Sequence, residues 1–252
     1  MDVVLSVVGA SVASWLAVEL LRTWRKRRRL HAEIWSLAFG AYALAMWALA
    51  SGLGFGWTSF TFRSFYFLGA IANIPLLAAG SVALHSERGG QRSMKVASLW
   101  LVFGFFAAFL APFTQPFPST GIPAGSDVFG FTFQLEALTL PGPRMFAAIS
   151  GSVGTLVIIG LALVSVVRFW KSMRRLAYGN LLIVAGVISP AMGGSLTALG
   201  ESAALSLTLT LGILLLWAGY AMASTARSDG DVRKVPGAGE EHADEDGDGR
   251  SA

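Results

Sequence analysis

Long apolar runs, separated by short charged or glycine- and proline-rich stretches, dominate the chain. An apolar run of about 20 residues is long enough for a helix to cross a hydrocarbon core of ~30 Å. Runs of this kind lie at 3–21, 33–52, 64–84, 96–112, 146–168, 178–199 and 203–223. The pattern therefore predicts an all-α fold, a polytopic membrane bundle of seven transmembrane helices.

The division between the last two runs depends on Gly200, Glu201 and Ser202, because the whole stretch 178–223 is otherwise apolar. A single helix over that stretch would be about 69 Å long at 1.5 Å per residue. This is more than twice the core thickness. We therefore expect the chain to turn back at these residues and to form an antiparallel helical hairpin.

Composition supports a membrane protein and argues against an ordinary soluble domain. Of the 252 residues, 54% are hydrophobic and only 13% are charged, whereas about a quarter of a soluble chain is charged. The chain has no cysteine, which excludes disulfides, thiolate metal sites and cysteine nucleophiles. The last predicted span has no lysine in its middle, which excludes a retinal Schiff base.

The positions of Lys and Arg predict the orientation of the bundle. Six of the eight residues Arg22–Arg29 are basic, and such a segment stays on the cytoplasmic side. The N-terminus is then outside and, with seven spans, the C-terminus is cytoplasmic. This arrangement places 17 of the 19 Lys and Arg inside and leaves only Arg63 and Arg144 outside. The basic residues flank apolar spans, so we expect anionic lipid at Arg22 to Arg29 and no nucleic acid.

Two segments outside the spans have distinctive compositions. Residues 113–145 are rich in proline and glycine, which predicts a turn-rich outer loop with little regular structure. Residues 226–252 are acidic and poor in apolar residues, which predicts a disordered cytoplasmic tail after a transmembrane domain at 1–225. The tail contains an EF-hand-like start at Asp244, but the chain ends at Ala252, short of the required twelfth-position glutamate. We expect the tail to be a contact for a cytoplasmic protein.

Polar residues at membrane depth mark a candidate site. In the third run Tyr66, Gly69, Asn73, Leu77 and Gly80 share one helical stripe, with Arg63 a turn above and Pro75 disturbing the backbone. The candidate intramembrane polar site comprises Asn73, Tyr66, Arg63, Ser195, Thr197, Ser206 and Thr210. Asn73 either bonds a neighbouring helix, which we favour, or lines a pathway for a small solute.

Other candidate chemistry is sparse. His31 and His85 flank the second and third spans near the cytoplasmic surface, where a loop or lipid-facing role is favoured over haem or metal ligation. Glu19 lies three residues before Arg22 and is expected to pair with it. Within the spans the sequence contains no recognisable catalytic constellation. We therefore predict that the protein is not an enzyme and carries no cofactor.

Three segments resemble those of an uncharacterised family of multi-span membrane proteins of high-GC Gram-positive bacteria. They are F-G-W-T-S-F-T-F-R-S-F-Y-F-L-G-A-I-A-N-I-P-L-L-A-A-G-S at 55–81, P-A-G-S-D-V-F-G at 123–130, and N-L-L-I-V-A-G followed by G-G-S-L-T-A-L-G-E at 180–201. The resemblance covers roughly residues 50–222. It implies a bacterial plasma-membrane protein and brings no activity with it.

Two functions remain open from the sequence. The favoured one is a non-enzymatic scaffold or sensor in the plasma membrane, and the alternative is a small transporter or channel for a small solute. A polar cavity reaching Asn73 and Ser195 would favour transport, whereas a dry, closed core would favour the scaffold or sensor.

Overall fold

The computed structural model describes residues 2–118, 121–170, 173–198 and 202–232. In chain order the described elements are α1 (Asp2–Arg27), α2 (Leu30–Phe55), α3 (Ser59–Tyr66), the π-helix η1 (Phe67–Ala72), α4 (Asn73–His85), α5 (Glu87–Leu110), α6 (Gly125–Val128), β1 (Thr132–Leu135), β2 (Leu138–Pro141), α7 (Pro143–Phe169), α8 (Arg174–Ala198) and α9 (Ser202–Val232). The predicted all-α class is confirmed, with one small hairpin as an addition.

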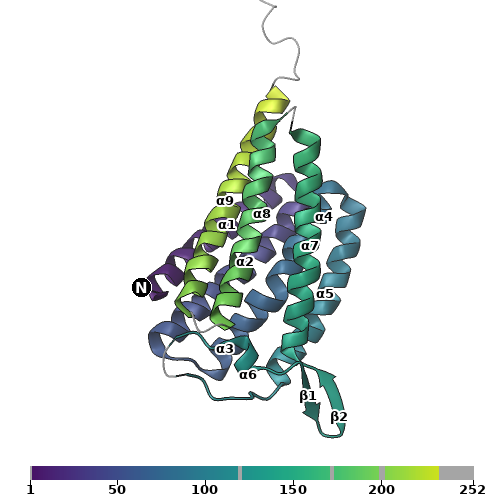
Figure 1. Ribbon diagram of the computed structural model, residues 1–252. Helices are drawn as coiled ribbons and strands as arrows, with labels where there is room; N and C mark the ends of the chain where they lie inside the picture. The colour runs from purple at the N-terminus through teal and green to yellow at the C-terminus, as the bar shows by residue number, and fades with distance from the viewer. Residues whose placement is uncertain (1, 119–120, 171–172, 199–201, 233–252) are drawn as a thin grey trace, which may run out of the picture.

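The long helices lie side by side in one elongated bundle, and the hairpin β1–β2 projects from one of its ends (Figure 1). Neighbours in sequence pack as neighbours in space: α1 on α2, α4 on α5, α7 on α8 and α8 on α9. α2 also packs on α4, and α9 packs on α1, which brings the last helix back to the first. A helix such as α2 is therefore covered by more than one neighbour, α1 and α4.

Six helices are long and apolar enough to cross a membrane, as judged by length and composition over the described residues. They are Asp2–Arg27, Leu30–Phe55, Ser59–His85, Glu87–Leu110, Pro143–Phe169 and Ala204–Met222. The sixth predicted span, 178–199, coincides with α8, in which the described apolar stretch is the shorter Ala177–Pro190. Its role as a span stays a prediction.

The surface of the bundle carries large hydrophobic side chains. Phe55 is 92% exposed, Val167 80% and Leu156 72%, while the small side chains of Ala10 and Ala13 are fully buried. A soluble protein rarely exposes a continuous apolar surface of this kind. The helices are compatible with an integral membrane protein, in which lipid covers that surface.

Several helices begin before the predicted apolar runs, because polar caps start them outside the run. The Thr58 hydroxyl accepts from the Thr61 backbone N–H at 3.1 Å and starts α3, five residues before the predicted 64. The Ser86 hydroxyl accepts from the Gly89 N–H at 3.2 Å and starts α5. At the other end of the chain, α9 continues to Val232, seven residues beyond the predicted boundary of the tail.

The outer loop contains more regular structure than its composition predicts. One turn of helix, α6, is followed by the antiparallel pair β1–β2, in which Thr132 lies opposite Pro141 and Leu135 opposite Leu138. The two-residue turn is possible because Glu136 adopts a φ of 54°. The expectation of little regular structure at 113–145 is therefore wrong for this part of the loop.

Helices α8 and α9 pack through glycines. A Cβ atom on Gly219 would lie 2.6 Å from the Gly179 carbonyl oxygen, and a Cβ atom on Gly212 would lie 2.9 Å from that of Gly186. The two backbones approach this closely only because no side chain separates them.

We therefore expect Gly219→Ala to separate α8 from α9 and to lower the free energy of unfolding by about 1–3 kcal/mol, the usual effect of overpacking. Gly160→Ala on α7 is the matched control, because a Cβ atom there meets nothing within 4 Å. Unfolding of both variants in detergent micelles measures the difference. Equal stability of the two would contradict the close packing of this helix pair.

Candidate functional site

The third predicted span consists of three helical pieces, α3, η1 and α4, joined without a break. In η1 the backbone widens to π geometry, so the Asn73 N–H donates to the Leu68 carbonyl, five residues back. Pro75, two residues further, has no N–H to donate. A single π turn inside an α-helix is uncommon and is often associated with function. Pro75, from which the sequence predicted a disturbed backbone, thus accompanies a local change of helix type.

Asn73 lies directly after the π turn and is buried, with 4% of its surface exposed. Its Oδ1 atom has no hydrogen-bond partner among the described residues. The sequence predicted that this side chain bonds a neighbouring helix, and for its oxygen that prediction is wrong. A buried amide oxygen without a donor lowers stability, because its desolvation is not offset.

The stripe that contains Asn73 faces the interior, as predicted. Tyr66, Asn73, Leu77 and Gly80 are buried, and a Cβ atom on Gly69 would meet the Ala45 side chain of α2 at 3.4 Å. The stripe therefore follows α2.

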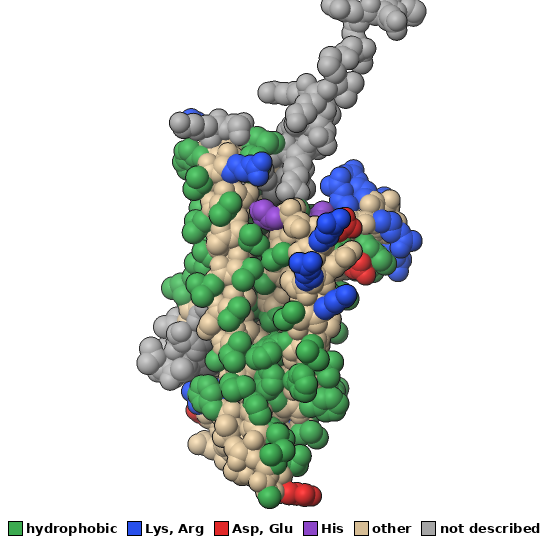
Figure 2. Space-filling model, turned by 90° about the vertical axis from the view of Figure 1, so that its right-hand side faces the viewer, with side chains coloured by type: hydrophobic (Ala, Val, Ile, Leu, Met, Phe, Trp, Pro, Cys, Tyr) green, Lys and Arg blue, Asp and Glu red, His purple; other side chains and the backbone are tan. Residues whose placement is uncertain are grey.

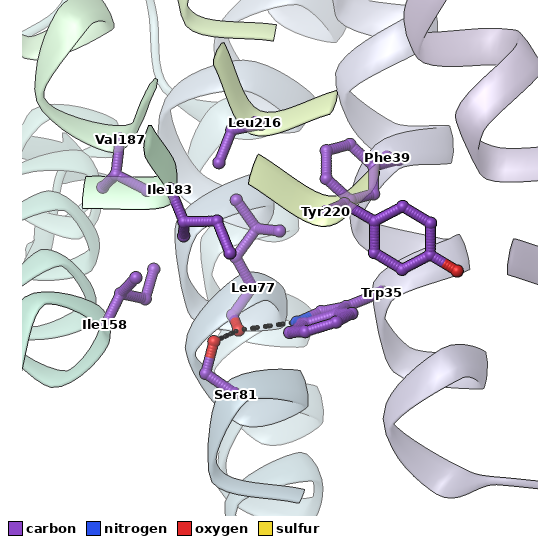
Figure 3. Close-up of a pocket in the computed structure, with 9 residues that line it drawn as sticks. All are labelled: Trp35, Phe39, Leu77, Ser81, Ile158, Ile183, Val187, Leu216 and Tyr220. Atoms are coloured by element: carbon purple, nitrogen blue, oxygen red, sulfur yellow. Dashed lines mark hydrogen bonds between the residues drawn. The ribbon is translucent and has the colours of Figure 1, made fainter. Parts of the chain in front are cut away.

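At the inner end of this stripe lies a small apolar cavity between α2, α4, α7, α8 and α9 (Figure 3). Its volume is about 30 Å³, room for one or two water molecules. The lining residues are Trp35, Phe39, Leu77, Ser81, Ile158, Ile183, Val187, Leu216 and Tyr220. The Trp35 indole N–H (3.3 Å) and the Ser81 hydroxyl (2.8 Å) both donate to the Leu77 carbonyl. Asn73 does not line this cavity.

At the outer end Arg63 links α3 to the end of α5. Its guanidinium donates to the carbonyls of Ala108 and Ala111, the latter at 2.8 Å. The same group lies 4.2 Å from the centre of the Phe113 ring and 5.8 Å from that of Phe129. Arg63 thus satisfies terminal carbonyls of α5, complements the negative end of its dipole and holds the outer loop by cation–π contacts.

Tyr66 and Trp57 hold the outer loop on the bundle beside Arg63. The Tyr66 ring contacts Phe129, with centroids 5.0 Å apart, and a Cβ atom on Gly125 would lie 2.3 Å from the Tyr66 ring. The Trp57 indole N–H donates to the Gly121 carbonyl at 2.9 Å. We call residues 111–142 the outer cap, after the outer loop that the sequence predicts, and these contacts hold its described residues against the bundle.

The remaining predicted polar residues do not join Asn73. The Thr210 hydroxyl donates to the Leu5 carbonyl of α1 at 2.9 Å. Ser206, one turn earlier on the same helix, is fully buried and its Oγ has no partner among the described residues. The side chains of Ser195 and Thr197 lie outside the part of the chain that the structure describes. The structure thus brings Arg63 and Tyr66 together at the outer end, and it places Thr210 against α1.

Sequence reasoning missed the aromatic residues that join helices through their polar atoms. The Tyr42 hydroxyl donates to the Leu209 carbonyl of α9 at 2.7 Å, and Trp35 and Trp57 make the bonds given above. Aromatic residues with a polar atom inside apolar runs were the only available signal. One local expectation agrees with the structure: Glu19 lies 3.7 Å from Arg22. His85 ends α4, and its Nδ1 lies 3.0 Å from the Ser81 carbonyl of the same helix.

Comparisons with known proteins add no family: no protein-family model, no curated protein and no solved structure matches the chain. The class therefore follows from the fold alone, which is a bundle of apolar helices compatible with an integral membrane protein. Among the described residues no group of three or more His, Asp or Glu is placed to hold a metal ion.

The contacts of Arg63 give a first prediction for this site. Arg63→Gln removes the charged donor to two carbonyls of α5 and should lower the free energy of unfolding by about 1.5–3 kcal/mol. Arg144→Gln is the matched control, because it removes the same charge from the other predicted outer arginine, whose guanidinium lies 4.6 Å from the centre of the ring of Phe131, an exposed residue. Thermal unfolding and limited proteolysis of the outer cap report the effect. If both variants were equally stable and equally resistant, the role of Arg63 would be refuted.

Asn73 gives the second prediction. Because its Oδ1 is unpaired, Asn73→Leu should leave the stability unchanged or raise it. Thr210→Val, which deletes a bond seen in the structure, should cost about 0.6–1.7 kcal/mol, the range for polar contacts between membrane helices. Denaturant titration of both variants in micelles makes the comparison. A larger loss for Asn73→Leu than for Thr210→Val would show that Asn73 is bonded after all.

Proposed function

We propose that the protein is a non-enzymatic membrane sensor, in which the third span transmits a change at the outer cap to the core of the bundle. The observation that carries the proposal is the π turn η1 between α3 and α4. On its outer side Arg63 and Tyr66 bind α3 to the outer cap. On its inner side the buried face of α4 packs against α2.

A π turn is a helix with one extra residue, and it can move along the chain or be absorbed. Absorbing it would shift α3 by one residue relative to α4, a rotation of about 100° and a translation of about 1.5 Å. The unpaired Oδ1 of Asn73 supports such a role, because it removes a bond that would otherwise hold one register. A buried polar group that lowers the stability of the fold is typical of functional elements.

The described core supports a sensor over a pore or a catalyst. The cavity beside Leu77 is small and almost entirely apolar. The polar atoms of Tyr42, Ser189 and Thr210 donate to backbone carbonyls of neighbouring helices. These hydrogen bonds join the helices to one another.

The proposal includes an orientation and a location. With the N-terminus outside and the C-terminus cytoplasmic, the outer cap faces the exterior and Arg22–Arg29 face the cytoplasm. The resemblance at 55–81 favours the plasma membrane of a bacterium. The tail 226–252 is then available to a cytoplasmic protein.

Distances between labelled cysteines test the sensor. The chain has no native cysteine, so labels at Ser126 on the outer cap and Gln91 on α5 report one distance in a bilayer. We expect two distance populations in the otherwise unchanged chain and a single population after deletion of Ala70, which removes the extra residue of η1. Ala70→Ser, which preserves the segment length, is the control. One population in all three chains would refute the sensor.

The alternative is a transporter or channel for a small solute, and one observation favours it: a buried amide oxygen without a partner is also what a polar ligand would bind. Osmotic swelling of proteoliposomes in urea or glycerol distinguishes the two functions. If the protein is a transporter, the unchanged chain should make the vesicles permeable to the solute and Asn73→Leu should abolish that permeability. If it is a sensor, vesicles with the unchanged chain and vesicles with Asn73→Leu should be no more permeable than vesicles without protein.

A further inference from the structure

Basic residues from two distant segments gather at one end of the bundle. Arg25, Lys26 and Arg27 close α1, and Arg28 and Arg29 form the turn to α2. Arg88, Arg92 and Lys95 lie in the first turns of α5 and are exposed. Figure 2 shows Lys and Arg side chains collected at this end, with hydrophobic side chains covering the surface below them.

The fold fixes the two segments near each other. Leu30 at the start of α2 and Met94 on α5 both pack on Ile34, Ala79 and Ala83. The start of α5 is itself close to α4, because a Cβ atom on Gly90 would lie 2.3 Å from the Ala83 Cβ.

The turn between α1 and α2 keeps its charges outward. Arg28 adopts a φ of 50°, and its guanidinium lies 5.1 Å from the centre of the Trp24 ring. Arg27 to Arg29 are exposed.

The positive end of α5 continues into an apolar surface on the same helix. Val96 is 70% exposed, Leu99 60% and Phe103 56%, and these residues follow Arg92 and Lys95 at helical spacing. Exposed apolar residues continue to Leu110, about 22 Å along the helix axis. One leaflet of the hydrocarbon core is about 15 Å thick. A cationic end followed by such a stripe matches an anionic headgroup followed by an acyl chain.

We propose that this surface of α5 binds an anionic phospholipid. Arg88, Arg92 and Lys95, which we call the headgroup triad, hold the phosphate, and the acyl chain lies along Val96, Leu99 and Phe103. The basic turn at Arg28 and Arg29 adds to the local potential. The carboxylates that flank these basic segments in sequence are Glu19, Glu33 and Glu87, and Glu19 is paired with Arg22 at 3.7 Å. The site requires that the bundle lies in a bilayer, but not that it acts as a sensor.

The test measures the thermal unfolding of the full chain in dodecylmaltoside micelles titrated with dioleoylphosphatidylglycerol or dioleoylphosphatidylcholine. We expect the anionic lipid to raise the unfolding temperature and the zwitterionic lipid to have a much smaller effect. In Arg92→Gln/Lys95→Gln the apparent affinity for phosphatidylglycerol should fall about 30-fold, since each cation near the surface contributes a factor of about five. Unfolding in pure detergent checks that the variants fold.

The matched control is Arg168→Gln/Arg174→Gln, which removes the same charge from α7 and α8. This control should retain the affinity of the unchanged chain. An equal loss in both variants would show a non-specific charge effect and would overturn the proposal. Stabilisation by inorganic phosphate alone would point to a soluble anion and would also overturn it.

The acidic segment 240–248 of the same chain is the competing occupant, and truncation after Val232 distinguishes it from lipid. If phosphatidylglycerol stabilised the protein only after this truncation, the tail would be the occupant and the proposal would fail. Equal stabilisation of full and truncated chains would support lipid.

Discussion

In a hydrocarbon environment every backbone polar group must find its partner within the protein, and this constraint explains why nearly all described residues between the ends of the bundle are helical. The third span departs from a regular α-helix. Pro75 has no N–H to donate to the turn before it, and just ahead of it the backbone forms a π turn in which the Asn73 N–H donates to the Leu68 carbonyl. The function proposed here depends on that local exception inside an otherwise regular bundle.

The outer cap depends on the same constraint at the end of a helix. The last carbonyls of α5 have no partner within their own helix, and Arg63 supplies two donors from α3. Because Phe113 and Phe129 contact the same guanidinium, one side chain joins a helix end, a span and a loop. The outer cap is therefore joined through Arg63 to the segment 59–85, which contains the π turn.

Much of this architecture follows from the sequence, because lipid makes hydropathy a direct constraint on helices. The lengths of the apolar runs predicted the long helices, and the helical spacing of polar and small residues predicted the burial of Asn73 and Leu77. The π turn itself was not predictable: Pro75 signals a disturbed helix, but whether the backbone kinks or widens depends on packing with α2 and α7. The partners of Arg63 lie 45 and 48 residues away, and the target of Thr210 lies 205 residues away. No local pattern encodes such pairs.

The central claim is that the third span changes register at its π turn while the rest of the bundle keeps its packing. Hydrogen–deuterium exchange of the full chain in a bilayer tests it most directly, by comparing the amides of 67–74 with those in the middle of α7. The account predicts faster exchange confined to 67–74, because a change of register there breaks only the hydrogen bonds of the π turn. Uniformly slow exchange along the whole third span would contradict it.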